Sequence, residues 1–119
     1  MGCRILVVDD EALICESIRL LLAYDGHRVE TASGGEEALK RFAAEEFDLV
    51  FTDFCMPGMK GDELAVNIKN RAPDKPVILL TAFPPSYHVP AIDLVLTKPF
   101  YLSTLREAIE TVMNKVRAK

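Results

Sequence analysis

The sequence predicts an α/β fold in which one parallel β-sheet is covered by helices on both faces. Four short apolar runs alternate along the chain with segments of helical period. Continuous apolar runs, without polar alternation, are typical of strands that are buried on both faces. An alternation of strand and helix favours parallel pairing, because each helix carries the chain back to the other end of the sheet.

The first half of the chain predicts two strands and one helix between them. The first strand is expected over the apolar run 5–8. A helix follows, because apolar residues then recur at helical spacing, at Ile14, Ile18, Leu21 and Leu22. Asp25-Gly26 ends this helix. Residues 28–32 alternate polar and apolar side chains, which favours a strand at an exposed edge of the sheet.

The second half repeats the pattern. Ser33-Gly34-Gly35 predicts a capped start of the second helix. A third helix begins near Gly61 and ends before Pro73. Further strands are expected over 49–51, 77–80 and 94–96. The last helix carries apolar residues at Leu102, Leu105, Ile109, Val112 and Val116.

The segment between the fourth and fifth strands departs from the alternation. Pro84, Pro85 and Pro90 crowd this segment. Proline cannot donate a backbone hydrogen bond and its ring clashes with the preceding turn of a helix. We therefore expect the fourth helix to be shortened, irregular or replaced by a loop.

Length and charge exclude several classes of protein. The chain has 119 residues, which suits a single domain. It carries 14 Lys and Arg against 18 Asp and Glu, a formal net charge of −4. Proteins that bind nucleic acid through bulk charge concentrate positive charge, so direct nucleic-acid binding is not expected. The apolar runs are far shorter than the ~20 residues of a membrane span, so membrane insertion is not expected either.

Cysteine usage predicts a reducing compartment. Cys3, Cys15 and Cys55 are odd in number and none is spaced as Cys-x-x-Cys. This pattern indicates neither a disulfide framework nor a zinc site. We expect reduced thiols that pack as small hydrophobic side chains. The composition as a whole predicts a soluble, acidic, cytoplasmic protein.

Polar residues follow the apolar runs at the point where each strand ends. Asp9 and Asp10 follow the first run, Asp53 and Thr81 follow later ones, and Lys98 follows the last. In open parallel α/β sheets, ligands bind beyond the carboxyl ends of the strands, so these side chains should meet. Clustered carboxylates repel one another, and a cation such as Mg²⁺ relieves that cost. A lysine and a hydroxyl suit phosphate oxygens, and one carboxylate is available as a nucleophile.

Taken singly, each of these residues has an ordinary structural explanation. An acidic residue after a strand is commonly a helix N-cap, which would account for Asp9, Asp10 or Glu11 alone. Lys98 alone would be a solvated surface charge, and Thr81 a turn residue. Their convergence at one edge favours a functional site over these separate roles.

The sequence resembles the receiver domain of two-component response regulators over residues 4–116. The motifs that carry the resemblance are ILVVDDE at 5–11, DFCMPGMKG at 53–61, TA at 81–82 and KPF at 98–100. The resemblance implies a flavodoxin-like, doubly wound sheet of five parallel strands in the order 2-1-3-4-5. It also implies that residues 1–119 form a single receiver domain, either as a stand-alone regulator or as part of a longer protein.

The resemblance assigns a role to each site residue. Asp53 would be the phosphoacceptor, modified by a histidine kinase or a histidine phosphotransfer protein. Asp9, Asp10, Asp53 and the backbone carbonyl of Cys55 would hold Mg²⁺. Thr81 and Lys98 would contact the phosphoryl group, and the Lys98-Pro99 peptide bond would be cis.

Two positions depart from the family pattern. The aromatic residue expected three positions before Lys98 is replaced by Val95, and Thr81 lies only 17 positions before Lys98 (98 − 81). We therefore expect phosphorylation to reorder the loop 83–90, with Phe83 or Tyr87 substituting for the missing aromatic side chain. Cys55 and Phe83 orient water poorly, which predicts a long-lived phosphorylated state.

These observations favour a phosphorylation-dependent signalling module that acts on a downstream protein target and is not a metabolic enzyme. One alternative is a receiver fold used as a phosphorylation-independent binding module. Members of that class usually lack the phosphoacceptor or the acidic pair, whereas this sequence keeps both, as Asp53 and as Asp9-Asp10. Another alternative is a phosphohydrolase of the haloacid dehalogenase type. That class needs Asp-x-Asp after the first strand, where this chain has Asp9-Asp10.

Overall fold

Five parallel strands form one sheet in the order β2-β1-β3-β4-β5, as the resemblance implies. The computed structural model describes residues 2–118 of the chain. Its elements are, in order, β1 (Arg4–Val8), α1 (Ala12–Tyr24), β2 (Arg28–Ala32), α2 (Gly35–Ala44), β3 (Leu49–Thr52), α3 (Gly61–Arg71), β4 (Val77–Thr81), β5 (Leu94–Thr97) and α4 (Leu102–Arg117). The predicted flavodoxin-like α/β fold is therefore confirmed.

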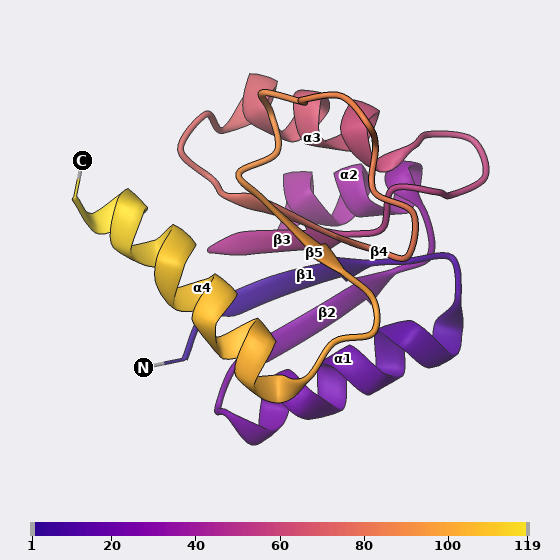
Figure 1. Cartoon of the computed structure of the whole chain (residues 1–119). Helices are drawn as coiled ribbons and strands as arrows, with labels where there is room; N and C mark the ends of the chain where they lie inside the picture. Colours follow the sequence, from indigo (N-terminus) through magenta and orange to yellow (C-terminus); the bar gives the residue numbers. More distant parts are fainter. Residues whose placement is uncertain (1, 119) are drawn as a thin grey trace.

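Helices cover both faces of the sheet (Figure 1). α1 and α4 lie on one face, where Ile18 and Leu105 join a buried apolar cluster. α2 and α3 lie on the other face, where Leu64 belongs to a second cluster. Successive side chains of a strand point to opposite faces, so Val7 joins the first cluster and Leu6 the second. The apolar runs 5–8, 49–51 and 77–80 are thus continuous because both of their faces are buried, whereas the run 94–96 is only partly buried and leaves Val95 exposed.

Three strands extend one residue beyond the apolar runs that predict them. β3, β4 and β5 each end on a threonine, at Thr52, Thr81 and Thr97. Threonine is β-branched and fits a strand, and its hydroxyl can be buried where it finds a partner. The Thr52 hydroxyl, for example, donates a hydrogen bond to the Asp53 carbonyl oxygen at 2.9 Å.

The predicted cap of α2 is wrong in its chemistry, although the helix begins where expected. Gly34 occupies the N-cap position and the cap carries no side-chain hydrogen bond. The Glu37 carboxylate instead accepts hydrogen bonds from the backbone N–H and the hydroxyl of Ser33, at 2.6 and 3.1 Å. Both bonds lower the pKa of the Glu37 carboxyl, and the bond from the Ser33 backbone N–H has the larger effect. α1 likewise begins after Glu11 without a side-chain cap.

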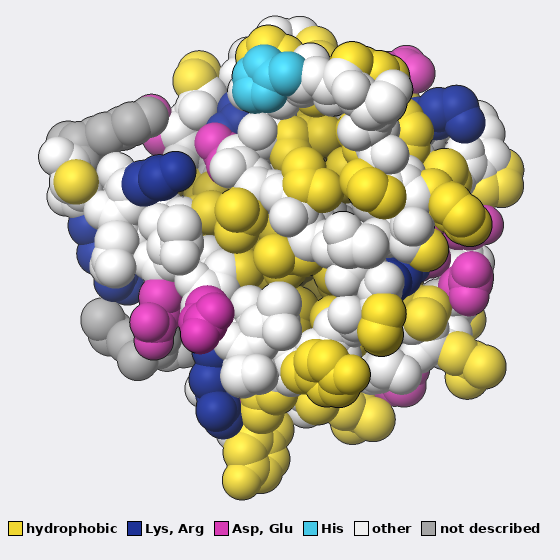
Figure 2. Space-filling view, in the orientation of Figure 1, with side chains coloured by type: hydrophobic (Ala, Val, Ile, Leu, Met, Phe, Trp, Pro, Cys, Tyr) yellow, Lys and Arg dark blue, Asp and Glu magenta, His cyan; other side chains and the backbone are white. Residues whose placement is uncertain are grey.

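Residues 82–93 connect β4 and β5 through turns and bends, which confirms that no regular helix forms there. The Tyr87 hydroxyl donates to the Asp62 carboxylate at the start of α3. Because residues 82–93 form no helix that could cover β5, the Val95 side chain is 44% exposed. Figure 2 shows hydrophobic side chains gathered over the middle of this face, where β5 and the preceding loop lie in Figure 1.

The cysteines only partly follow the prediction. Cys3 and Cys15 are buried and free, as expected, but Cys55 is exposed. Cys55 lies in the loop between β3 and α3, where its side chain has no core to join. Within residues 2–118, no helix is long and apolar enough to cross a membrane.

Candidate functional site

Three carboxylates meet at the carboxyl ends of β1 and β3. One oxygen from each of Asp9, Asp10 and Asp53 lies within 4.8 Å of the other two. Asp9 and Asp53 are buried, with exposed fractions of 2% and 8%, whereas Asp10 is exposed. β1 and β3 are neighbours in the sheet and run in parallel, so the residues after their ends are brought side by side. The predicted convergence of the acidic residues is therefore present.

Lys98 supplies the positive charge of the site. Its Nζ donates hydrogen bonds to Asp9 Oδ2 at 2.9 Å and to Asp53 Oδ2 at 3.4 Å. Burial alone would lower the pKa of Lys98, but its bond to Asp9 and the charges of Asp9 and Asp53 raise it above its usual value. Lys98 therefore stays protonated and opposes both buried carboxylates. The Lys98-Pro99 peptide bond is cis, as the resemblance implies.

Asp9 is held by several hydrogen bonds. Its Oδ1 accepts from the Glu11 backbone N–H at 2.9 Å, and its own N–H donates to the Ala32 carbonyl at 3.1 Å. Burial raises the pKa of Asp9, while the bonds from Glu11 and Lys98 act in the opposite direction. A further cation beside Asp9 would favour its ionised form.

Asp53 is fixed through both its backbone and its side chain. Its N–H donates to the Val8 carbonyl at 3.0 Å, and its Oδ1 accepts from the Phe54 N–H at 2.7 Å. The start of α3 passes so close that a Cβ on Gly61 would overlap the Asp53 carbonyl oxygen. These contacts leave Asp53 Oδ2 directed at Lys98.

Thr81 and Cys55 are not members of the three-carboxylate cluster. Thr81 ends β4, is buried, and its hydroxyl accepts a hydrogen bond from the Phe83 N–H at 3.2 Å. This hydroxyl is therefore engaged by the loop that follows it rather than by the carboxylates. Cys55 lies two positions beyond Asp53 in an exposed loop. The roles implied for Thr81 and for the Cys55 carbonyl stay predictions.

The family model of the response regulator receiver domain matches residues 5–110. The chain belongs to the response regulator receiver domain family. Members of this family serve two-component signalling rather than metabolism. The strand order and the cluster of carboxylates at the carboxyl ends of the strands are consistent with this family.

Curated relatives of this receiver domain are response regulators. MprA of Mycobacterium ulcerans (strain Agy99) is 34% identical over an alignment of 122 positions, which covers 98% of this chain and 53% of that protein. MprA of Mycolicibacterium vanbaalenii is 35% identical over an alignment of 120 positions, which covers 97% of this chain and 52% of that protein. The receiver domain thus spans about half the length of these relatives.

Solved structures share the fold over nearly the whole chain. The response regulator TrrA of Thermotoga maritima, in complex with Mg²⁺-BeF, is 40% identical with a TM-score of 0.85, covering 94% of this chain and 99% of that one. A CheY-like receiver domain protein from Methanospirillum hungatei JF-1 is 28% identical with a TM-score of 0.92, covering 99% and 98%.

Sequence reasoning missed several groups that shape the receiver site. Backbone N–H groups of Glu11 and Phe54 bind the aspartates, and a backbone donor leaves no trace in residue type. Gly61 carried a signal, since a glycine that opens a helix suggests close approach of another segment. The thiol of Cys15 was also missed, because it was expected to act as a hydrophobic side chain.

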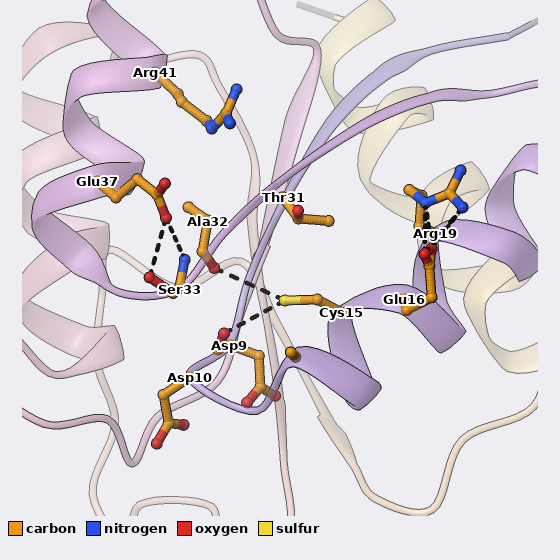
Figure 3. A pocket seen from close by; sticks show the side chains of 11 residues that line it. Asp9, Asp10, Cys15, Glu16, Arg19, Thr31, Ala32, Ser33, Glu37 and Arg41 are labelled. Carbon is orange, nitrogen blue, oxygen red and sulfur yellow. Dashed lines mark hydrogen bonds and ion pairs between the residues drawn. The ribbon is translucent and has the colours of Figure 1, made fainter.

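A pocket of about 330 Å³ opens beside the acidic pair, between α1, β2 and α2 (Figure 3). Its walls include Asp9, Asp10, Cys15, Ser33 and Glu37. Burial, followed by the charge of Asp9, raises the pKa of the Cys15 thiol to about 11. The thiol is therefore a protonated donor at neutral pH and an unreactive nucleophile.

Proposed function

We propose that this receiver domain accepts a phosphoryl group on Asp53 and thereby switches a protein-interaction surface. The observation that carries this proposal is Lys98, which bonds to a buried carboxylate pair, Asp9 and Asp53, while Asp10 lies alongside. A cation fixed beside a carboxylate nucleophile opposes the negative charge that a transferring phosphoryl group brings. The partner would be a histidine kinase or a histidine phosphotransfer protein, as the family implies.

Magnesium fits the donor set of this site. Three carboxylate oxygens within 4.8 Å of one another are hard oxygen ligands, and the exposure of Asp10 leaves room for water. The raised pKa of Asp9 indicates that one ammonium does not fully compensate the buried charge. We propose Asp9, Asp10, Asp53 and the Cys55 carbonyl as the residues that would hold Mg²⁺. The metal would supply Lewis-acid stabilisation of phosphoryl oxygens.

The residues of the chain carry the transfer as follows. An Asp53 Oδ atom attacks phosphorus, its new O–P bond forms as the N–P bond to the donor imidazole breaks, and an acyl phosphate results. The departing imidazole keeps the electron pair of the broken bond. Lys98 stays within reach of the phosphoryl oxygens, and the buried position of Asp53 limits water around them. The Thr81 hydroxyl, which accepts the Phe83 N–H, would reorient to donate a hydrogen bond to a phosphoryl oxygen and would release that N–H.

A direct test uses acetyl phosphate as the donor. With Mg²⁺, mass spectrometry should show one added phosphoryl group on the wild type and none on Asp53→Asn. Asp74→Asn, at an exposed aspartate outside the site, is the control and should be modified like the wild type. A wild type that gains no phosphoryl group would contradict the proposal and favour the phosphorylation-independent binding module. Release of phosphate from added monoesters would favour the phosphohydrolase.

The output of the switch is proposed to be a contact with a downstream protein in the cytoplasm. The loop 82–93 links Thr81 to β5, so loss of the Thr81–Phe83 hydrogen bond would first change the conformation of that loop. Direct contact with nucleic acid and membrane insertion form no part of the proposal. This assignment follows the family and the position of the loop.

A further inference from the structure

Cys15 lies in α1, a few residues from its start, with its thiol aimed at the ends of β1 and β2 (Figure 3). The thiol lies 3.4 Å from the Asp9 carbonyl oxygen and 3.8 Å from the Ala32 carbonyl oxygen. The residue is 6% exposed. At these distances one S–H group can donate to either carbonyl, as a weak hydrogen bond.

These two carbonyls belong to the backbone that holds the acidic pair. The Ala32 carbonyl also accepts the Asp9 N–H at 3.1 Å, which joins the end of β2 to the end of β1. The thiol therefore completes a set of contacts that brings α1, β1 and β2 together at a single residue, Asp9. The side chain of Asp9 then reaches Lys98 at 2.9 Å.

We propose that Cys15 is a positioning residue of the phosphorylation site, whose thiol fixes the peptide plane between Asp9 and Asp10. The Asp9 carbonyl and the Asp10 N–H belong to one planar unit. A bond to that carbonyl therefore sets the direction in which the Asp10 side chain leaves the backbone. This inference rests on the proposed function, since it concerns the cation-binding carboxylates of the same site.

Asp10 is the residue most dependent on this contact. Its side chain is exposed, so packing does not hold it in place. Asp9, by contrast, is 2% exposed and is also fixed by Glu11 and Lys98. A rotation of the shared peptide plane would thus move the Asp10 carboxylate with little resistance. Metal affinity is sensitive to such outer contacts, which orient the ligands.

The alternative is that Cys15 only fills space, since it also belongs to the apolar cluster under α1. The two roles differ in what they require of the side chain. Filling space requires volume, whereas positioning requires a donor. Cys3 offers a matched control, because it is 7% exposed and belongs to the same cluster, but lies before β1 at the opposite end of that strand.

The test compares Cys15→Ala, Cys15→Ser and Cys3→Ala with the wild type. Magnesium affinity is measured by titration calorimetry, and hydrogen exchange at the Asp9 amide, which donates to the Ala32 carbonyl, is measured without metal. We expect Cys15→Ala to weaken magnesium binding about threefold to tenfold and to speed exchange at this amide. Cys15→Ser keeps a donor and should restore both readouts to within about twofold of the wild type. Cys3→Ala should change neither.

Two results would overturn the proposal. One is equal magnesium affinity and equal exchange in Cys15→Ala and the wild type; the other is a serine variant as impaired as the alanine variant. Should the serine variant be unfolded at the assay temperature, Cys15→Thr takes its place as the hydroxyl donor. The exchange readout needs neither metal nor phosphate. A wild type that fails to take up phosphoryl groups would therefore contradict the proposed function and leave Cys15 still testable.

Discussion

At the scale of single residues, Lys98 links the two buried carboxylates of the receiver site. Its ammonium lies 2.9 Å from Asp9 and 3.4 Å from Asp53, and only 15% of its side chain is exposed. Removing one charge of a buried ion pair leaves the opposite charge buried without a partner, which is strongly destabilising. The lysine therefore stabilises the fold, whether or not a phosphoryl group binds.

We expect Lys98→Met to destabilise the metal-free protein by about 3 kcal/mol at pH 7. The raised pKa of Asp9 would rise further, so the folded state would bind protons more readily than the unfolded state. Stability contributed by this group is then greatest at low pH and falls as pH rises through the folded pKa. Urea unfolding should accordingly show a smaller loss at pH 4.5 than at pH 7. Lys40→Met, at an exposed lysine, is the control, and an equal loss at both pH values would contradict the prediction.

Gly61 belongs to the same scale, because its missing side chain makes room for Asp53. A Cβ at this position would lie 3.0 Å from the Asp53 carbonyl carbon and from Phe54 Cα. We expect Gly61→Ala to cost about 2 kcal/mol by overpacking and to slow phosphoryl uptake from acetyl phosphate at least tenfold. Gly34→Ala is the control, since a Cβ there meets nothing within 4 Å. Uptake at the wild-type rate in Gly61→Ala would count against a positioning role.

At the scale of elements, the connections determine how the strand ends are held. The turn between α1 and β2 is fastened to the start of β1, because the His27 Nδ1 atom accepts the Cys3 N–H at 2.9 Å. On the other side, Arg106 of α4 binds Asp25 at the end of α1 through two hydrogen bonds of 2.6 and 2.7 Å. These contacts secure the amino end of the sheet, opposite the acidic site.

The His27 contact predicts a pH dependence of stability. Burial lowers the pKa of His27, although the Asp25 charge acts the other way. The folded state therefore binds fewer protons than the unfolded state below the usual histidine pKa of about 6.5. Stability should fall as pH drops from about 7 to 5, by up to about 1.4 kcal/mol per pH unit. His27→Gln should remove this slope and His88→Gln, on the exposed loop before β5, should keep it; a slope unchanged in both would contradict the assignment.

Elements also differ in how far the sequence predicts them. The strands are recognised from apolar runs such as 77–80, since two buried faces leave no polar positions. The convergence of Asp9, Asp53 and Lys98 follows from topology, because parallel strands end at one edge. The bonds from Ser33 to Glu37 and from Cys15 to Asp9 were not predicted, since they depend on the packing of neighbouring elements. Local residue type carries no record of such contacts.

At the scale of the whole molecule, the two apolar clusters share the same strands and so depend on each other. Residues of β1 alternate between the cluster under α1 and α4 and the cluster under α2 and α3. Loss of either cluster would expose one face of β1, β3 and β4. A single cooperative unfolding transition is therefore expected.

This dependence can be tested with one substitution in each cluster. Ile18 in α1 and Ile68 in α3 are buried on opposite faces of the sheet. Each change to alanine should cost about 3 kcal/mol, and the double variant should lose about the sum, because the sites share no contact. Urea unfolding followed by circular dichroism measures both quantities. Two separate transitions in any variant would show that the faces unfold independently.

The acidic site is assembled from residues far apart in the chain, and this has a kinetic consequence. Lys98 and Asp9, which share a hydrogen bond, are 89 positions apart. Contacts of such sequence separation form late in folding, because long loops must close before the strands that carry them can pair. A complete but partly folded chain therefore carries these side chains without bringing them together. On the proposed function, phosphoryl uptake would require the complete fold, so only fully folded molecules would take part in signalling.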